Sequence, residues 1–281
     1  MTEKPPSLLA EHRSLLEKHN LAALKRFGQN FLIDRHVLNK IVAAAELTWE
    51  DTVIEVGPGL GVLTRELAAR AGSVIAVEID RGLAAILGQE FEAETNVKII
   101  EDDILQTDPK SLVENKPYKI VANLPYNITS PTLRHFLEAS KPPSLAVVTV
   151  QKEVARQIVA APGEMSLLAV AVQFYAHPEI IANVPPGAFY PAPKVSSAIL
   201  KLSISVEPPL DREQATSFFN LARAGFAARR KQLINTLSAG LRLDKDALTK
   251  ILNQVGIAPQ RRAETLSVPE WLKLYRELNR A

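Results

Sequence analysis

Short β-branched runs alternate with helical segments between residues 51 and 160, and no other feature limits the possible folds of the chain as strongly. The strand-like runs are DTVIEVG, SVIAVEID, VKIIEDDIL, YKIVANLPY and LAVVTVQ, and segments with helical spacing of apolar residues separate most of them. Strands that alternate with helices at this spacing form a parallel sheet covered on both faces. The sequence therefore predicts an α/β fold around a mostly parallel sheet.

The segments on either side of this region have different patterns. Residues 7–24 and 35–47 have helical spacing, with Asp34 as the predicted N-cap of the second helix. Residues 166–176 fit a strand or a helix equally well. Residues 178–205 are rich in proline and have β-like runs at both ends, which predicts an antiparallel pair around a stiff loop.

The C-terminal part of the chain is predicted to be entirely helical. Four segments with helical spacing follow the doubled proline of VEPPLD, residues 206–211, which marks the expected domain boundary. The sequence thus predicts three parts: an N-terminal helical extension at residues 1–24, an α/β domain at residues 25–207 and a helical domain at residues 208–281.

Composition narrows the chemistry and the compartment. The chain of 281 residues has no cysteine, and its five histidines show no close metal-ligand spacing, so we expect no metal site and a reducing compartment such as the cytoplasm. It has no run of 18 apolar residues and no apolar leader segment at its start, so we expect no membrane span and no signal peptide. The absence of Gly-x-Ser-x-Gly disfavours a hydrolase of that type.

Charge is distributed unevenly along the chain. Residues 211–281 hold 13 Lys and Arg against 7 Asp and Glu, whereas residues 1–210 hold 20 against 24. A basic region beside a mildly acidic body is typical of a module that faces a polyanion, although a solvated helical surface would have the same composition.

A glycine-rich turn follows the first strand of the alternating region. Gly57, Gly59 and Gly61 lead from this strand into a helix, and such a turn can bind NAD, FAD or S-adenosylmethionine. The spacing Gly-x-Gly-x-Gly differs from the dinucleotide fingerprint. Glu55, two residues before the first glycine, would suit a pyrophosphate poorly but could suit an aminium group, which S-adenosylmethionine carries.

Acidic residues also end the next two predicted strands. Glu78 can accept hydrogen bonds from both hydroxyls of a ribose, and Asp103, next to Asp102, can accept from the exocyclic amine of adenine. Each of them alone could be a solvated strand end. Their succession after a glycine loop favours a ligand site at the carboxyl edge of the sheet.

The fourth predicted strand ends in the sequence Asn123-Leu124-Pro125-Tyr126. The side-chain oxygen of Asn123 and the carbonyl of Pro125 are two acceptors that match the two hydrogens of an exocyclic amine. Together they would orient the weakly nucleophilic amine of adenine towards a methyl group, and Tyr126 would offer a ring face for stacking the base. A structural turn containing proline is the alternative.

Seven segments form an ordered set of motifs that spans nearly the whole chain. They are RFGQNFLID (26–34), EVGPGLGVLT (55–64), VEID (77–80), DDIL (102–105), NLPYNITSP (123–131), FYPAPKVSSA (189–198) and RRKQLINTL (229–237). Together they resemble the KsgA/RsmA family of small-subunit (16S) rRNA adenine-N6,N6-dimethyltransferases. The resemblance implies a Rossmann-like S-adenosylmethionine-dependent methyltransferase with a mostly parallel seven-stranded sheet, plus a small all-helical C-terminal domain.

The resemblance also implies roles for individual residues. The cofactor S-adenosylmethionine would be bound by Asn30, Leu32, Gly57, Glu78, Asp103 and Asn123. The catalytic residues would be Asn123, Pro125, Tyr126 and Phe189. Phe189 would sandwich the target adenine with Tyr126, whereas its sequence context alone suggests a core aromatic. The residues in contact with RNA phosphates would be Arg229, Arg230, Lys231, Arg261 and Arg262.

The implied substrate is a pair of adjacent adenosines in a hairpin loop near the 3′ end of 16S rRNA, within an immature small ribosomal subunit. The enzyme is expected to act as a monomer, without a metal and away from membranes, in ribosome biogenesis. The 24 residues before the first motif are longer than the motif needs, and the resemblance gives them no role.

Other functions fit parts of the pattern. Enzymes of the macrolide-resistance type, which dimethylate an adenosine of 23S rRNA, share the glycine loop and the Asn-x-Pro-Tyr core, but NLPYNITSP, FYPAPKV and the helical C-terminal region favour the small subunit. A small-subunit assembly factor with secondary catalysis is a further alternative, and the intact quartet from Asn123 to Tyr126 argues against lost catalysis. The glycine spacing disfavours a NAD dehydrogenase.

Overall fold

The computed structural model describes residues 7–18, 30–205 and 207–280, which fall into two compact units. The first, called here the sheet unit, runs to Ala155 and includes residues 178–204. The second, the helical unit, contains residues 156–177 and the chain from Ser205 onward. The predicted α/β domain at 25–207 therefore differs from the sheet unit, because residues 156–177 group with the helices.

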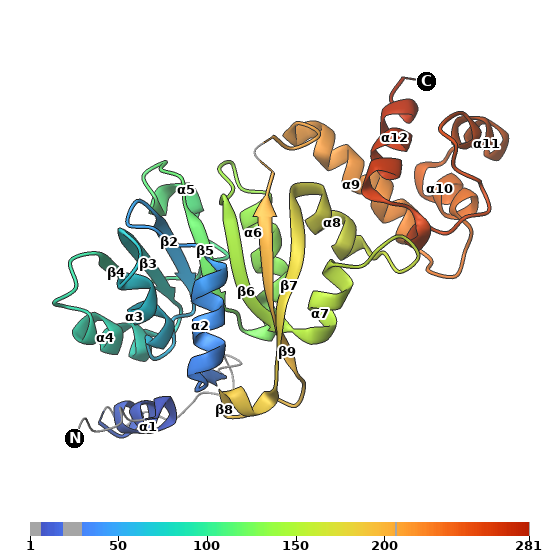
Figure 1. The fold of residues 1–281 in the computed structure, drawn as a ribbon. Helices are drawn as coiled ribbons and strands as arrows, with labels where there is room; N and C mark the ends of the chain where they lie inside the picture. The colour runs from blue at the N-terminus through green and yellow to red at the C-terminus, as the bar shows by residue number, and fades with distance from the viewer. Residues whose placement is uncertain (1–6, 19–29, 206, 281) are drawn as a thin grey trace. The chain divides into compact units, whose positions relative to one another are not determined.

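The sheet unit is built on seven strands in the order β4-β3-β2-β5-β6-β9-β7 (Figure 1). Neighbouring strands from β4 to β6 are parallel, and β9 is antiparallel to β6, which confirms the predicted fold class. The strands are β2 (Thr52–Val56), β3 (Ser73–Glu78), β4 (Val97–Glu101), β5 (Lys119–Asn123), β6 (Leu145–Gln151), β7 (Ala176–Val184) and β9 (Ser197–Ile204). The chain moves outward from β2 to β4 and then returns to β5, so the switch point lies between β2 and β5, where such sheets bind ligands.

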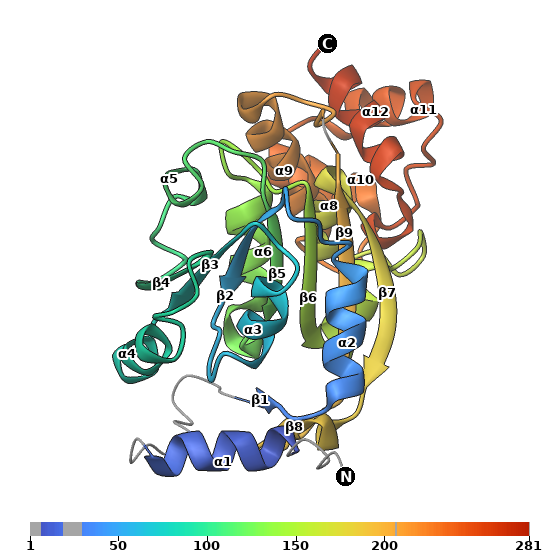
Figure 2. The same cartoon turned by 60° about the vertical axis from the view of Figure 1, so that its left-hand side comes forward.

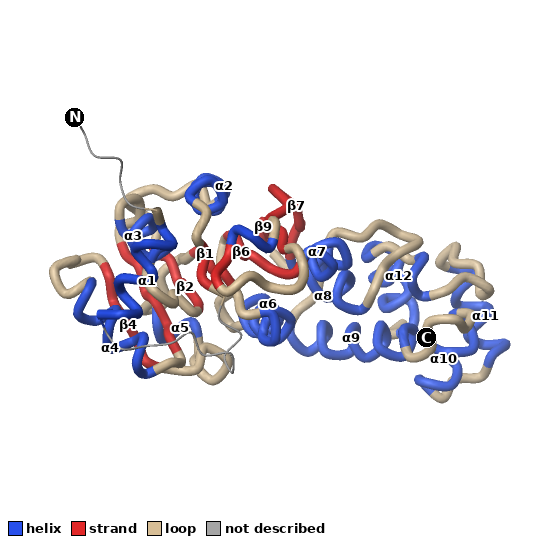
Figure 3. Tube along the Cα trace, turned by 90° about the horizontal axis from the view of Figure 1, so that it is seen from below, coloured by secondary structure: helices blue, strands red, loops and turns tan. Residues whose placement is uncertain are grey.

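Helices cover both faces of this sheet. Figure 3 shows α2 and α3 on one side of the strands and α6 on the other. Asp34 caps α2 as predicted, because its side chain accepts from the backbone N–H groups of His36 and Val37. The helices are α1 (Leu8–Lys18), α2 (Arg35–Ala44), α3 (Val62–Ala68), α4 (Arg81–Glu90), α5 (Pro109–Leu112), α6 (Thr129–Leu137) and α7 (Lys152–Ile158). The rest of the predicted extension, residues 1–6 and 19–24, lies outside the described residues.

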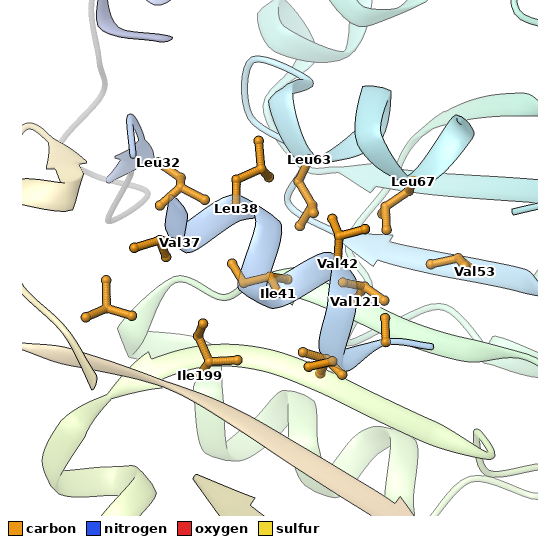
Figure 4. Close-up of a cluster of buried hydrophobic side chains, with 14 of the residues drawn as sticks. Leu32, Val37, Leu38, Ile41, Val42, Val53, Leu63, Leu67, Val121 and Ile199 are labelled. Carbon is orange, nitrogen blue, oxygen red and sulfur yellow. The ribbon is translucent and has the colours of Figure 1, made fainter. Parts of the chain in front are cut away.

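The core of the sheet unit lies between α2, α3 and the strands (Figure 4). Apolar residues of α2 recur at helical spacing, so one stripe of the helix is buried. The packed residues include Val37, Leu38, Ile41 and Val42 of α2, Leu63 and Leu67 of α3, and Val53, Val121 and Ile199 of the sheet. Each fully buried aliphatic side chain of this kind contributes roughly 1.5–3 kcal/mol, which makes the strand ends a rigid base for a site.

A second, two-stranded sheet joins the N-terminal segment to the proline-rich loop. β1 (Phe31–Leu32) lies beside β8 (Phe189–Tyr190) and pairs with it in the antiparallel sense (Figure 2). In this pairing Leu32 is opposite Phe189. The loop also contains the 3₁₀ helix η3 (Pro186–Ala188) and connects β7 to β9, which are neighbours in the main sheet. This small sheet brings two segments far apart in sequence to the same edge of the unit.

The helical unit contains the four helices predicted after the doubled proline and α8, for which the sequence left strand and helix open. They are α8 (Leu167–Tyr175), α9 (Arg212–Phe226), α10 (Leu233–Leu241), α11 (Lys245–Gln254) and α12 (Val268–Leu278). Their shared core surrounds Phe218 and Trp271, both fully buried, and Phe174 of α8 packs in the same core. This packing explains why residues 156–177 belong to the helical unit. Within the described residues, no helix has the length and apolar character needed to cross a membrane.

We expect Gly225→Ala to destabilise the helical unit. A Cβ at Gly225 would lie 2.3 Å from a ring carbon of Trp271, a fully buried side chain. Overpacking of this kind costs about 1–3 kcal/mol, which exceeds the roughly 0.5–1 kcal/mol that alanine gains over glycine in a helix. Urea unfolding should show the loss. Gly88→Ala in α4 is the control, since a Cβ there meets no atom within 4 Å and should stabilise; equal stability of both variants would contradict this packing.

Candidate active site

A pocket lies at the carboxyl ends of β2, β3, β4 and β5, at the switch point of the sheet. The small β1–β8 sheet contributes to its wall. The pocket is lined by every residue that the sequence assigned to the cofactor or the target base: Asn30, Leu32, Gly57, Glu78, Asp103, Asn123, Pro125, Tyr126 and Phe189. The structure therefore brings these residues to one place, although they come from six separate stretches of the chain.

The ionisable lining of the pocket is strongly acidic. Glu55, Glu78, Asp102 and Asp103 contribute carboxyl groups, and among the described residues no Lys, Arg or His lines the pocket. A lining of this charge disfavours phosphate groups and favours a ligand that carries positive charge. In the described ranges, His, Asp and Glu do not form a group of three or more that could hold a metal ion.

The glycine loop needs glycine for two different reasons. Gly59 has a φ of +61°, and its N–H donates to Oε2 of Glu78 at 3.1 Å, so the loop backbone is tied to the end of β3. Gly61 has a φ of +77°, and a Cβ there would lie 2.6 Å from the ring of Phe91. Both conformations are strained for other residues. At Gly59 the loop therefore presents backbone without a side chain to the pocket, and at Gly61 it packs closely against the end of α4.

The two buried glutamates of the pocket differ in their hydrogen bonding. Glu78 accepts N–H bonds from Gly59 and from Asp80, at 3.1 and 3.0 Å, and these bonds oppose the rise in its pKa that burial causes. Glu55 is 1% exposed, and its Oε2 has no hydrogen-bond partner. Burial raises the pKa of Glu55 to about 8, the charge of Glu78 adds to the rise, and Thr64 opposes it. Without a cationic ligand, Glu55 therefore holds a proton at neutral pH.

Asn123 is held in one orientation by the N-terminal segment. Its Nδ2 donates to the backbone carbonyl of Asn30 at 3.0 Å. A carbonyl oxygen only accepts, so the amide nitrogen must face Asn30. The side-chain oxygen of Asn123 is left as an acceptor, which is the role that the sequence assigned to it.

The carbonyl of Pro125 is less free than the sequence suggested. It accepts from the backbone N–H of Ile128 at 3.2 Å and from the hydroxyl of Thr129 at 3.4 Å. Both bonds are long, and they belong to the 3₁₀ turn η2 (Tyr126–Ile128) and the start of α6. They orient the carbonyl and reduce its capacity for a further donor, so the side chain of Asn123 is the stronger acceptor of the pair.

The two aromatic residues of the pocket are positioned by buried neighbours. The hydroxyl of Tyr126 lies 2.6 Å from Oγ of Ser197, and burial raises the pKa of Tyr126 while this contact opposes the rise. Phe189 is 3% exposed and belongs to the core cluster of the sheet unit, yet it also lines the pocket. Phe189 is thus a core aromatic that also lines the pocket, and its stacking on the target adenine stays a prediction. Ser197 carried no signal in the sequence that pointed to this contact.

The two aspartates after β4 differ in how far their carboxylate oxygens are already used as hydrogen-bond acceptors. Asp102 is occupied, since its oxygens accept from the N–H of Asp103 and from the hydroxyl of Thr107, both at 2.8 Å. Asp103 accepts from the N–H of Leu105 at 3.0 Å through Oδ1. Asp103 is therefore the better candidate for binding a ligand amine.

The known proteins that this chain resembles are enzymes for which such a site is expected. Residues 20–280 match the family model described as ribosomal RNA adenine dimethylase. The chain belongs to the ribosomal RNA adenine dimethylase family. A curated relative of this dimethylase, the ribosomal RNA small subunit methyltransferase A of Dehalococcoides mccartyi, is 53% identical over 270 residues, which cover 96% of this chain and 93% of the relative.

Two solved structures resemble the dimethylase over most of its length. A dimethyladenosine transferase from Plasmodium falciparum has a TM-score of 0.79 and 27% identity, and the match covers 89% of this chain and 98% of that one. The 23S rRNA methyltransferase ErmE has a TM-score of 0.72 and 30% identity, covering 89% and 100%. The Rossmann-like methyltransferase fold that the sequence predicted is confirmed.

The five basic residues that the sequence assigned to RNA differ in their surroundings within the dimethylase. Arg229, Arg230 and Lys231 are exposed, and the pairs of Arg229 and Arg262 with Glu264 span 3.5 and 3.8 Å on the surface. Such surface ion pairs contribute little to the stability of the fold, and they leave the cations available to another anion.

Arg261 is engaged inside the helical unit of the dimethylase. Its guanidinium donates to the hydroxyl and the carbonyl of Thr265 and to both carboxylate oxygens of Glu270. The hydrogen bond from Arg261 lowers the pKa of Glu270 to about 2. Since four of its five N–H donors already have partners, Arg261 is better suited to holding the start of α12 than to contacting a phosphate.

Proposed function

We propose that this dimethylase uses S-adenosylmethionine to dimethylate N6 of two adjacent adenosines in a hairpin loop near the 3′ end of 16S rRNA. Its substrate would be an immature small ribosomal subunit in the cytoplasm, and its role would lie in ribosome biogenesis. The observation that carries the proposal is that one acidic pocket is lined by both the glycine loop and the turn from Asn123 to Tyr126. The relatives named small subunit methyltransferase A support the choice of RNA.

The pocket fits S-adenosylmethionine by charge. When bound, the cofactor supplies a methyl group on a sulfonium, and its positive charges match the carboxyl-rich lining. Glu55, with its unpartnered oxygen, would hold the aminium group, Glu78 the ribose hydroxyls and Asp103 the adenine amine. Asn30, Leu32 and Gly57 would complete the cofactor site.

The residues of the turn would position the target base. Asn123 and Pro125 would accept the two hydrogens of the adenine amine, which orients the nitrogen lone pair towards the methyl group. Tyr126 and Phe189 would stack the base after it has left the RNA. Transfer of the methyl group to the neutral amine gives a methylated cation, which is strongly acidic. It would lose its proton to water without a dedicated base, which agrees with the lack of a His or Lys in the described lining of the pocket.

Methylation of 23S rRNA is the second candidate, because the chain resembles ErmE at 30% identity. The two candidates are separated by incubating purified small and large subunits that lack the modification with the protein and S-adenosylmethionine labelled in its methyl group. We expect label in the small subunit only. Label in 23S rRNA, with none in the small subunit, would reverse the choice.

We expect the triple replacement of Arg229, Arg230 and Lys231 by Ala to weaken subunit binding while cofactor affinity stays unchanged. These cations are exposed and would contact phosphates, so each lost contact should reduce the salt dependence of binding, with a slope change of roughly 0.7–0.9. Filter binding over a range of salt concentrations measures both effects.

Arg261→Ala is the matched comparison for the triple variant. It should leave the salt slope unchanged and lower the unfolding free energy of the helical unit by about 1–3 kcal/mol, because Glu270 loses its partner. This stabilising contribution is present above the ordinary pKa of Glu270 and disappears as the pH falls towards about 2. A salt slope that changes with Arg261 and not with the other three would contradict this assignment.

A further inference from the structure

Ser197 is a buried hydroxyl beside the pocket that the chemistry described above does not use. It is fully buried at the first position of β9 and pairs with Gln151 at the end of β6. Its Oγ lies 2.6 Å from the hydroxyl oxygen of Tyr126. A contact this short joins the antiparallel part of the sheet directly to the ring of Tyr126, which lines the pocket.

This contact acts on the ring of Tyr126 in a way that the other contacts of the turn do not. The backbone of Leu124 is tied to β6 through the carbonyl of Thr149, and the side chain of Asn123 is tied to Asn30. Neither bond restrains the aromatic ring, which leaves the sheet on a 3₁₀ turn. Within the described part of the chain, Ser197 is the hydrogen-bond partner of the Tyr126 hydroxyl.

The direction of the hydrogen bond follows from burial. If Tyr126 were the donor, the hydrogen of the fully buried Ser197 hydroxyl would need another acceptor, and the described residues provide none. If Ser197 is the donor, its hydrogen is satisfied, and the hydrogen that remains belongs to Tyr126, a half-buried residue that lines the pocket. Burying an unsatisfied donor is unfavourable, so Ser197 donates to Tyr126.

We propose that Ser197 is a positioning residue of the target-base site, because its buried hydroxyl anchors the hydroxyl end of Tyr126 and so holds in place the ring against which the adenine stacks. This inference rests on the proposed function, in which Tyr126 stacks the base. Phe189 lies in the proline-rich loop that ends at Ser197, so one segment of the chain would supply one stacking ring and hold the other in place.

Kinetics of Ser197→Ala test the proposal. The single-turnover rate on unmethylated small subunits should fall roughly three- to tenfold, the usual effect of one hydrogen bond, while the Kd for S-adenosylmethionine stays unchanged. Tyr126→Phe should lose a similar factor, and the double variant should lose no more than Tyr126→Phe alone. Ser197→Cys, which keeps a weak donor, should retain more activity. Ser196→Ala, one residue away, is the control and should match the wild type.

A spectroscopic measurement tests the contact independently of activity. Protein with ¹³C at Cζ of its tyrosines gives a Tyr126 resonance that Tyr126→Phe identifies by its loss. This resonance should shift in Ser197→Ala and not in Ser196→Ala.

The two measurements separate the possible failures. An unshifted Tyr126 resonance, or rate losses that add up in the double variant, would overturn the role of Ser197. If the wild type transfers no methyl group to small subunits but the resonance shifts, the proposed function fails while the contact stands. Should Ser197→Ala not fold, Ser197→Cys and Tyr126→Phe carry the same comparison.

Discussion

Asn123→Ala should reduce the rate of methyl transfer by roughly a hundred- to a thousandfold, while small subunits still bind. The variant removes the acceptor that holds the adenine amine in line with the methyl group, and removal of one preorganised polar contact has effects of this size. The Pro125 carbonyl would accept only the other hydrogen of the amine, and Ile128 and Thr129 already donate to that oxygen, so it cannot take over the role of Asn123. Single-turnover methylation and subunit binding, measured separately, give the two results.

Two further variants sharpen the test of Asn123. Asn123→Asp keeps an acceptor but places a carboxylate oxygen against the carbonyl of Asn30, where the amide now donates at 3.0 Å, so we expect an intermediate loss. Asn253→Ala, at an exposed position of α11, should match the wild type. Full activity of Asn123→Ala would contradict the two-acceptor mechanism, and loss of subunit binding in the same variant would point to a role in folding or docking.

Glu55→Gln should change how the stability of the cofactor-free protein depends on pH. The pKa of Glu55 is raised to about 8 in the folded protein, from an ordinary value of 4.5. Between these values the folded state holds a proton that the unfolded chain has lost, so the unfolding free energy of the wild type falls as pH rises. The full effect is about 4–5 kcal/mol by pH 8, and a glutamine does not titrate. Urea unfolding of both proteins at pH 5, 6.5 and 8 should show a gap that widens with pH.

The same residue links cofactor binding to proton release. An aminium group beside Glu55 favours the ionised carboxylate, so binding of S-adenosylmethionine at pH 7 should release about one proton from the wild type. Calorimetry in buffers of different ionisation enthalpy measures this release. Glu55→Gln should lose it and bind the cofactor at least about tenfold more weakly. Parallel stability curves, or equal proton release by both proteins, would contradict the account of Glu55.

Most of the secondary structure, and the position of the site residues at one edge of the sheet, could be predicted because both follow from local sequence patterns. The strands of the parallel sheet are mostly apolar, β-branched runs, Asp34 is a capping residue directly before an apolar stripe, and the four C-terminal helices have clear spacing. Carboxyl ends of neighbouring parallel strands meet at one edge, so Glu78, Asp103 and Asn123 could be placed together from their positions alone.

The features that escaped prediction depend on contacts between distant segments. The bond from Ser197 to Tyr126 spans 71 positions, and that from Asn123 to Asn30 spans 93. No periodicity encodes either of them. In the sequence, Arg261 and Arg229 are both arginines of the basic C-terminal region and cannot be told apart. Only the contacts of Arg261 with Thr265 and Glu270 distinguish them. The membership of residues 156–177 in the helical unit likewise depends on which core buries α8.

Nucleoside mass spectrometry of small-subunit rRNA tests the central claim most directly. Small subunits that lack the modification are incubated with the protein and S-adenosylmethionine, and the rRNA is digested and mapped. The account predicts N6,N6-dimethyladenosine at two adjacent positions of a hairpin loop near the 3′ end of the rRNA, and none with Asn123→Ala. Absence of dimethyladenosine from every small-subunit particle tested, with the wild-type protein folded and bound to the cofactor, would contradict it.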